Sequence, residues 1–366
     1  MAPEIPQTCR AVVIDAPGAP WTLKSIPTPQ AQQGEVLIKV LACGVCHSDS
    51  FLQQGAFGDG ASFPRIPGHE IIGNIVALGP GETRWKVGQK VGGGWHGAHD
   101  GTCKGCNKGL YQMCESRLVN GVSRDGGYAE YCTLRSEAVI RLPDDADPAA
   151  YAPILCAGVA VFNGIRQMNP TSGSVVAVQG IGGLGHLAIQ YARRMGFRTV
   201  ALSTSSNKKE FAEQLGATDF VDTSKEDAAT ALQRMGGASL IVVTAPNASV
   251  MSGLVGGLGI LGKLLILARE CSSLMSCYMN DFRGAGADEV IAVGDVPINT
   301  GVLLGIGGSV HVWPAGHALD TEEAIEFAQR QGVKCLVEKF PLERTAEAVK
   351  RVTDNSVRFR GVIVME

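Results

Sequence analysis

Apolar and polar positions follow two different rhythms along the chain. Before residue 150, short apolar runs are separated by Gly- and Pro-rich turns, and these runs are 10–14, 35–42, 71–79 and 129–134. Runs of this length that end at turn residues are typical of β-strands. The pattern therefore predicts an all-β region in the first part of the chain.

A second rhythm begins at Gly173, where short apolar strands alternate with longer helical patterns. The predicted strands are 174–180, 199–203, 219–222, 239–245 and 263–268. The helical pattern is clear at 185–196 and 207–217. Strands that alternate with helices predict a doubly wound parallel sheet. Three further elements follow residue 316, two helical patterns and a last apolar strand, at 321–332, 342–354 and 360–366.

Composition narrows the functional class. The 366 residues suffice for two domains, because a single core stops growing near roughly 250–300 residues. The net charge of −3 predicts no long-range attraction to nucleic acid or to an anionic membrane, so a small neutral substrate fits better. The start of the chain lacks an export pattern, and the most apolar segment, 253–268, is broken by Lys263. We therefore expect a cytoplasmic protein.

The 11 cysteines are an odd number, and several are clustered. Without an export signal, such clusters favour metal binding over disulfides. The 47 glycines predict many tight turns and close backbone approaches.

The run GIGGLG at 180–185 follows a predicted strand and opens a predicted helix. In that context it predicts a dinucleotide site. Gly180 allows the turn, Gly182 lets the backbone approach a pyrophosphate, and Gly185 lets the helix pack on the strand. We expect the cofactor to contact Gly180, Gly182, Gly183, Leu184 and Gly185.

The next predicted strand ends at Ser203, where a carboxylate would normally bind the ribose 2′-hydroxyl. The run 203–209 offers hydroxyls, including Ser205, and the cations Lys208 and Lys209, which suit a 2′-phosphate. The lysines could instead be the solvated start of a helix. We expect NADP(H) to be preferred over NAD(H).

Three further islands hold potential metal ligands: CGVCHSD at 43–49, PGHE at 67–70 and APILCAG at 152–158. Isolated Cys and His residues are more often core residues than ligands. Here, however, GVCHSD, PGHEIIGNIVALG, KVGQKVG, a cysteine loop, CAG and GIGGLG occur in one order over almost the whole chain. In these motifs the chain resembles the zinc-dependent alcohol dehydrogenases of the medium-chain dehydrogenase/reductase superfamily, near the yeast-type and cinnamyl alcohol dehydrogenase branches.

The resemblance implies an α/β fold with a GroES-like β-rich catalytic domain and a Rossmann domain with a doubly wound parallel sheet. The implied boundaries are 1–156 for the catalytic domain, 157–315 for the Rossmann domain and 316–366 for a return to the catalytic domain. The implied activity is hydride transfer between NADP(H) and a primary alcohol or its aldehyde.

The resemblance also implies a catalytic zinc held by Cys46, His69 and Cys156, with the fourth position open for water or substrate oxygen. Asp49 would orient His69. Glu70 would lie behind the zinc and exchange with its water.

Other residues around this zinc carry over from the same resemblance. Ser48 would pass the substrate proton onward, and His47 would contact the pyrophosphate. Many relatives complete the proton relay with a histidine where this chain has Phe51, so the proton would leave through the cofactor ribose or water. Trp95 and Phe57 resemble walls of the substrate pocket, although either could be an ordinary core residue.

The loop at 95–115 contains three regularly spaced cysteines, Cys103, Cys106 and Cys114. The family's structural zinc loop reads C-x2-C-x2-C-x7-C, and Asp100 stands in the first position. Asp oxygen is a competent zinc ligand, so the resemblance implies a second, structural zinc. The alternative is a loop that has lost its metal, and His96 and His99 are spare donors nearby. We interpret four of the cysteines outside both proposed metal sites as ordinary thiols: Cys9, Cys43, Cys132 and Cys335.

The segment 269–292 has no counterpart in the resemblance. It is either a lid or oligomer contact at the strand ends or a translated intron or gene-model error. Its Cys271 and Cys277 are therefore not counted as ligands.

Two rival functions remain at this point. One is a zinc-independent enoyl or quinone reductase of the same superfamily, which would lack the ligands seen here. The other is a catalytically silent homologue with a binding role. Relatives commonly form dimers or tetramers through their Rossmann sheets, so we expect a homodimer or homotetramer.

Overall fold

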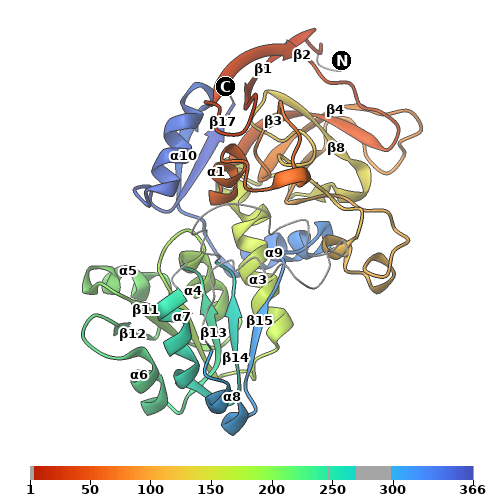
Figure 1. The fold of residues 1–366 in the computed structure, drawn as a ribbon. Coiled ribbons are helices and arrows are strands. Elements are labelled where there is room, and N and C mark those ends of the chain that lie inside the picture. The colour runs from red at the N-terminus through yellow and green to blue at the C-terminus, as the bar shows by residue number, and fades with distance from the viewer. Residues whose placement is uncertain (1–3, 246–247, 269–297, 366) are drawn as a thin grey trace.

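The computed structural model describes residues 4–245, 248–268 and 298–365. The segment 269–292, with Cys271 and Cys277, lies outside the described residues. Two bodies, each built on one large sheet, dominate the described part, and Figure 1 shows them one above the other with helix α3 (Ala157–Met168) between them.

Seven strands form the sheet of the upper body, in the order β16-β17-β3-β4-β5-β9, with β8 also paired to β3. Their bounds are β3 Glu35–Gly44, β4 Ile71–Leu78, β5 Lys90–Gly93, β8 Tyr131–Arg135, β9 Ile140–Arg141, β16 Val337–Pro341 and β17 Arg360–Val364. Among the described strands of this sheet, only β16 and β17 pair in parallel. The C-terminal strands therefore complete a sheet begun by the N-terminal part of the chain.

Shorter elements surround this sheet. The strand pairs are β1 Thr8–Val13 with β2 Thr22–Pro27, and β6 His96–Ala98 with β7 Leu118–Val119. The helices are α1 His47–Gln53, α2 Pro148–Tyr151 and α10 Thr345–Thr353. Short 3-10 turns in the described part of the chain are η1 Gly58–Gly60, η2 Cys106–Lys108, η3 Tyr111–Met113, η4 Ser136–Ala138, η5 Ala152–Leu155, η6 Ser206–Lys208, η7 Val255–Gly257 and η9 Leu342–Arg344.

Within the described residues, six parallel strands form the sheet of the lower body, in the order β12-β11-β10-β13-β14-β15. Their bounds are β10 Val175–Gln179, β11 Arg198–Ser203, β12 Asp219–Asp222, β13 Ala238–Val243, β14 Leu258–Ile266 and β15 Ser309–Val312. Besides α3, its helices are α4 Gly185–Arg194, α5 Lys209–Gln214, α6 Ala228–Arg234, α7 Ala248–Leu254, α8 Thr300–Ile306 and α9 Ala318–Gln331. This strand order is that of a doubly wound dinucleotide-binding sheet, so the predicted parallel sheet is confirmed.

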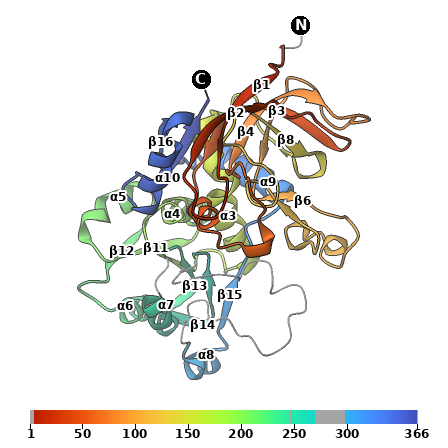
Figure 2. The ribbon, with the colours of Figure 1, turned by 45° about the horizontal axis from the view of Figure 1, so that its top comes forward.

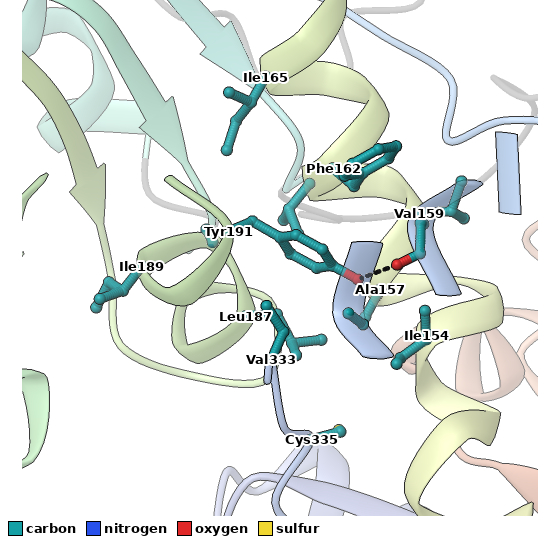
Figure 3. Packing of buried hydrophobic residues seen from close by; sticks show 14 of the residues in the cluster. Ile154, Ala157, Val159, Phe162, Ile165, Leu187, Ile189, Tyr191, Val333 and Cys335 are labelled. Atoms are coloured by element: carbon teal, nitrogen blue, oxygen red, sulfur yellow. Dashed lines mark hydrogen bonds between the residues drawn. The ribbon is translucent and has the colours of Figure 1, made fainter. Parts of the chain in front are cut away.

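One apolar core joins the two bodies. It contains residues of the upper sheet, such as Ile72 and Val362, together with Val178 of the lower sheet. Figure 3 shows its centre, where Phe162 of α3 packs against Tyr191 of α4 with ring centroids 5.5 Å apart. Because the same buried side chains contact both bodies, the position of one relative to the other is fixed by close packing.

Among the described residues, no single helix is long and apolar enough to cross a membrane. A bent pair of segments, Pro148–Leu155 and Ala157–Met168, meets the length and composition criteria only when the two are taken together. Many residues of this pair belong to the core that joins the two bodies.

Candidate active site and metal sites

Three segments that are distant in sequence bring the candidate ligands of the first metal site together. Cys46 precedes α1, His69 and Glu70 precede β4, and Cys156 lies between η5 and α3. One ligand atom from each of these four residues lies within 4.8 Å of the other three. The four side chains can therefore face a single ion.

The donor set fits a divalent cation such as zinc. Both ring nitrogens of His69 and Oε2 of Glu70 are buried with no hydrogen-bond partner among the described residues. A hydrogen bond with Cys156 lowers the pKa of Cys46 well below its ordinary value, and the same bond raises the pKa of Cys156. The two sulfurs thus favour a single shared proton, whose place a metal ion takes in thiolate sites.

Asp49 connects two of these ligands. Its Oδ1 lies 3.5 Å from Nδ1 of His69, which leaves Nε2 of the ring as the donor atom for a metal. Its Oδ2 accepts hydrogen bonds from the backbone N–H of Cys46 at 2.9 Å and from the hydroxyl of Tyr128 at 2.7 Å. Burial raises the pKa of Tyr128 well above its ordinary value, so the phenol keeps its proton and acts as the donor.

Glu70 forms a fully buried ion pair with Arg360, the first residue of β17. Burial raises the pKa of Glu70, and the Arg360 guanidinium opposes that shift. Gly44 makes room for the carboxylate, since a Cβ there would lie 1.8 Å from Glu70 Oε2. A Cβ at Gly183 would lie 3.2 Å from the Arg360 side chain, so Arg360 also lies against the glycine motif. Sequence reasoning missed Arg360, whose only signal is an arginine that opens an apolar strand.

The predicted proton relay is only partly assembled within the chain. Ser48 Oγ is buried and has no hydrogen-bond partner among the described residues, whereas His47 is exposed as the first residue of α1. Phe51 packs with an apolar cluster that contains Leu52 and Phe57. A free buried hydroxyl therefore lies next in sequence to His47, and Phe51 supplies no group that could carry its proton further.

Trp95 lies directly against a candidate metal ligand. Its ring stands edge-on to the ring of His69, with centroids 4.8 Å apart and planes at 90°. Phe57 packs against Trp95, with the two ring centroids 6.0 Å apart. Trp95 therefore borders His69 directly, and Phe57 packs against Trp95.

The loop at 95–115 forms a second candidate metal group. Its four ligand atoms lie within 4.8 Å of one another and come from Asp100, Cys103, Cys106 and Cys114. Oδ1 of Asp100 accepts hydrogen bonds from the backbone N–H groups of Cys103 at 2.9 Å and Thr102 at 2.7 Å, and these bonds hold the pKa of Asp100 well below its ordinary value. The carboxylate is thus ionised with Oδ2 available, and three sulfurs with one oxygen suit a tetrahedral zinc.

His96 and His99, the spare donors, are not part of this group. His99 Nδ1 lies 3.1 Å from His96 Nε2, and burial lowers the pKa of His96 to about 3. The ring of Tyr111 from the same loop lies 5.1 Å from that of His317, which caps α9. These ring contacts hold the loop against the start of α9. Figure 2 draws the ribbon of the loop on the side of the molecule where α9 lies.

The other described cysteines outside the two groups are buried free thiols, namely Cys9, Cys43, Cys132 and Cys335. None of the four belongs to a candidate metal group in the described part of the chain.

The glycine motif lies between β10 and α4, at the carboxyl end of the parallel sheet. Gly180 has a φ of +91°, which L side chains rarely adopt, and a Cβ at Gly185 would lie 1.9 Å from the carbonyl oxygen of Gly180. A Cβ at Gly182 would meet nothing within 4 Å. The surface at Gly182 is therefore open to a ligand, next to the N-terminus of a ten-residue helix.

The end of β11 carries the residues expected to select the cofactor. Ser203 is buried, and Lys208 donates a hydrogen bond to the carbonyl oxygen of Ile181 in the glycine motif at 3.1 Å. Ser205 caps η6 through its hydroxyl. Sequence reasoning missed Asp222, which is the register partner of Ser203 on the neighbouring strand.

Neighbouring hydroxyls and a lysine surround the Asp222 carboxylate. Ser206 and Ser224 donate hydrogen bonds to its carboxylate, which lowers its pKa, and Lys225 Nζ lies 3.4 Å away. Lys225 Nζ also donates a hydrogen bond to Ser206 Oγ at 2.8 Å. The surface beside Ser203 therefore combines hydroxyls with a lysine and one paired carboxylate.

Comparison with known proteins matches both bodies. The family model described as an alcohol dehydrogenase GroES-like domain matches residues 32–144, and the model described as a zinc-binding dehydrogenase matches residues 183–282. The chain is 50% identical over 365 residues to alcohol dehydrogenase patD of Penicillium expansum, with 100% of both chains covered. It is 45% identical over 362 residues to alcohol dehydrogenase notN of an Aspergillus species, with 99% of both covered.

Solved structures share the fold. A cinnamyl alcohol dehydrogenase from Sorghum bicolor superimposes with a TM-score of 0.81 at 24% identity, and the match covers 98% of this chain and 97% of that one. The predicted combination of a GroES-like β-rich part with a Rossmann-type parallel sheet is thereby confirmed.

Proposed function

Because this chain belongs to the zinc-dependent alcohol dehydrogenase family of the medium-chain dehydrogenase/reductase superfamily, we propose that it uses zinc and NADP(H) to interconvert a primary alcohol and its aldehyde. Alcohol dehydrogenase activity as such follows from relatives that match the chain over its full length. The observation that best supports metal-dependent chemistry is the convergence of Cys46, His69, Glu70 and Cys156 within 4.8 Å.

Each residue of the site has a distinct role in this proposal. When bound, zinc would supply a Lewis acid for the substrate oxygen, and the nicotinamide would supply or accept hydride. Cys46, His69 and Cys156 would hold the metal, while Asp49 orients His69. Ser48 Oγ, buried without a partner among the described residues, would accept the proton of the alcohol and release it to the cofactor ribose or to water.

An assay of the purified chain tests the metal-dependent reaction. We expect NADPH oxidation with benzaldehyde or a short aliphatic aldehyde, and loss of that activity when a chelator removes the metal. Zinc analysis should give two equivalents per chain, one for the catalytic group and one for the group of Asp100, Cys103, Cys106 and Cys114. Full activity in metal-free protein would refute the mechanism, and it would favour a zinc-independent reductase.

The preference for NADP(H) rests on Ser203 and on the cations Lys208 and Lys225 near it. A carboxylate at position 203 would repel a 2′-phosphate and accept hydrogen bonds from a ribose 2′-hydroxyl. We expect Ser203→Asp to lower the ratio of kcat/KM for NADPH to that for NADH by roughly 10–100-fold, since a hydrogen bond to a charged group is worth about 1.5–3 kcal/mol.

Ser25→Asp is the matched control, because Ser25 is an exposed residue of β2 in the other body. It adds the same charge and should leave the ratio unchanged. If wild type prefers NADH, or if Ser203→Asp behaves like the control, the assignment of Ser203 is wrong.

We also propose that the chain forms a homodimer or homotetramer through the edge of the parallel sheet. Strand β15 is the outer strand of that sheet as far as the described residues show, and large apolar side chains near it are highly exposed, namely Ile260, Leu261, Leu304 and Val312. Exposed apolar groups on an edge strand favour pairing with a second copy. We expect light scattering to give at least twice the 38.4 kDa mass of one chain and Val312→Asp to shift it towards the monomer. A monomeric wild type would contradict this proposal.

A further inference from the structure

Tyr128 is a fully buried tyrosine that is not a candidate ligand. Its hydroxyl contacts Asp49, the carboxylate that lies beside His69. The residue is 0% exposed, and its hydroxyl donates a hydrogen bond of 2.7 Å to Oδ2 of Asp49, 79 positions earlier in the chain. Most buried side-chain polar atoms in proteins have a hydrogen-bond partner. In this case the partner is a carboxylate, which makes the bond shorter and stronger than a bond between neutral groups.

Asp49 transmits this contact to two candidate ligands. The same Oδ2 accepts the backbone N–H of Cys46, while Oδ1 faces Nδ1 of His69 at 3.5 Å. With the Tyr128 and Cys46 donors both bound to Oδ2, the plane of the carboxylate is fixed and Oδ1 remains directed at the imidazole. Loss of one donor would free the carboxylate to rotate away from His69.

The Tyr128 backbone and ring hold the turn that carries His69. The backbone N–H of Tyr128 donates to the carbonyl oxygen of Pro67 at 3.0 Å. A Cβ at Gly68, which has a φ of +94°, would lie 2.6 Å from the Tyr128 ring. The ring therefore packs directly against the residue before His69, and the turn can pass only because position 68 is glycine.

We propose that Tyr128 is a positioning residue for the catalytic metal, because its hydroxyl fixes Asp49 in the orientation that presents Nε2 of His69 to the ion. This inference rests on the proposed zinc-dependent function. Groups that orient a metal-bound histidine typically contribute about 10–100-fold to metal affinity. Tyr128→Phe should therefore weaken zinc binding at the catalytic group by about that factor while keeping the packing of the ring.

Tyr191→Phe is the matched control. Tyr191 is also 0% exposed, and its hydroxyl donates one hydrogen bond, to the carbonyl oxygen of Ala324 at 3.1 Å. That bond lies in the apolar core between α3, α4 and α9, as Figure 3 shows. Both variants thus lose one buried hydroxyl, but only one of the two hydroxyls is bonded to Asp49.

The experiment measures zinc affinity by competition with a chromogenic chelator, together with the absorption bands of the cobalt-substituted protein. The catalytic equivalent is identified as the one lost in Cys156→Ala. We expect Tyr128→Phe to lower the affinity of this equivalent about 10–100-fold and to shift its cobalt bands, with the second equivalent unchanged. Tyr191→Phe should match wild type in both readouts.

Three distinguishable outcomes would contradict either the proposed zinc-dependent function or the positioning role of Tyr128. If wild-type protein binds no metal that depends on Cys156, the proposed function itself fails. If wild type binds it and Tyr128→Phe binds it equally well, the positioning role fails alone. If Tyr128→Phe and Tyr191→Phe lose affinity to the same extent, with equal drops in the melting temperature of the metal-free chains, Tyr128 contributes only to packing.

Discussion

Cys156→Ala is expected to lower kcat/KM for aldehyde reduction by about 1000-fold or more, with loss of one zinc equivalent per chain. The Cys156 sulfur is one of four ligand atoms within 4.8 Å, and Cys156 directly precedes α3. A Lewis acid contributes several kcal/mol of transition-state stabilisation, and each 1.36 kcal/mol corresponds to about tenfold in rate. Steady-state kinetics and metal analysis on the same preparation provide the measurement.

Cys132→Ala is the control for this substitution. Cys132 is a buried free thiol on β8 and belongs to no candidate metal group of the described chain. It should keep both zinc equivalents and a rate within a few-fold of wild type. Should Cys156→Ala remain as active as Cys132→Ala, the catalyst would not be this group of ligands.

Arg360→Met is expected to lower the free energy of unfolding by about 3–5 kcal/mol, as measured by urea denaturation. Arg360 and Glu70 are 3% and 0% exposed in their side chains, and removal of one partner leaves the other charge buried and uncompensated. The double variant Glu70→Gln with Arg360→Met should recover much of this loss, because it removes both charges. Non-additivity in this double-mutant cycle measures the coupling of the pair.

Arg198→Met is the matched control on the surface. Arg198 pairs with Asp219 at 2.8 Å, but the side chains are 45% and 25% exposed. Exposed pairs contribute only about 0–1 kcal/mol, so this variant should differ little from wild type. Equal losses from Arg198→Met and Arg360→Met would show that burial does not set the strength of the inner pair.

The sequence predicted the fold because its signals are local. Strand and helix periods, the glycine motif and its position between a strand and a helix can each be read within a few residues, and together they predict the doubly wound sheet that the structure contains. The candidate metal ligands could also be predicted from the sequence, since Cys46 with Asp49 and His69 with Glu70 occur in short motifs.

The residues that contact those motif residues could not be predicted from the sequence. Arg360 lies 290 positions after Glu70, and an arginine at the start of an apolar strand usually indicates a solvated strand end. Asp222 faces Ser203 only because β12 pairs with β11 in one particular register. Contacts of this kind depend on the tertiary arrangement of strands, which periodicity does not specify. The spare donors His96 and His99 show the same limit, because proximity in sequence could not exclude them from the metal group.

Arg360 belongs to β17, near the C-terminal end of the sequence. The ion pair with Glu70 in the first metal site can therefore form only late in synthesis. Chains emerge from the ribosome N-terminus first, so the segments that carry Cys46, Glu70 and Cys156 are present long before β17, the last strand. Until β17 has been synthesised, the Glu70 carboxylate lacks the Arg360 guanidinium with which it pairs. Products of premature termination that lack this strand should therefore be inactive and poorly folded, and cellular quality control would be expected to degrade them.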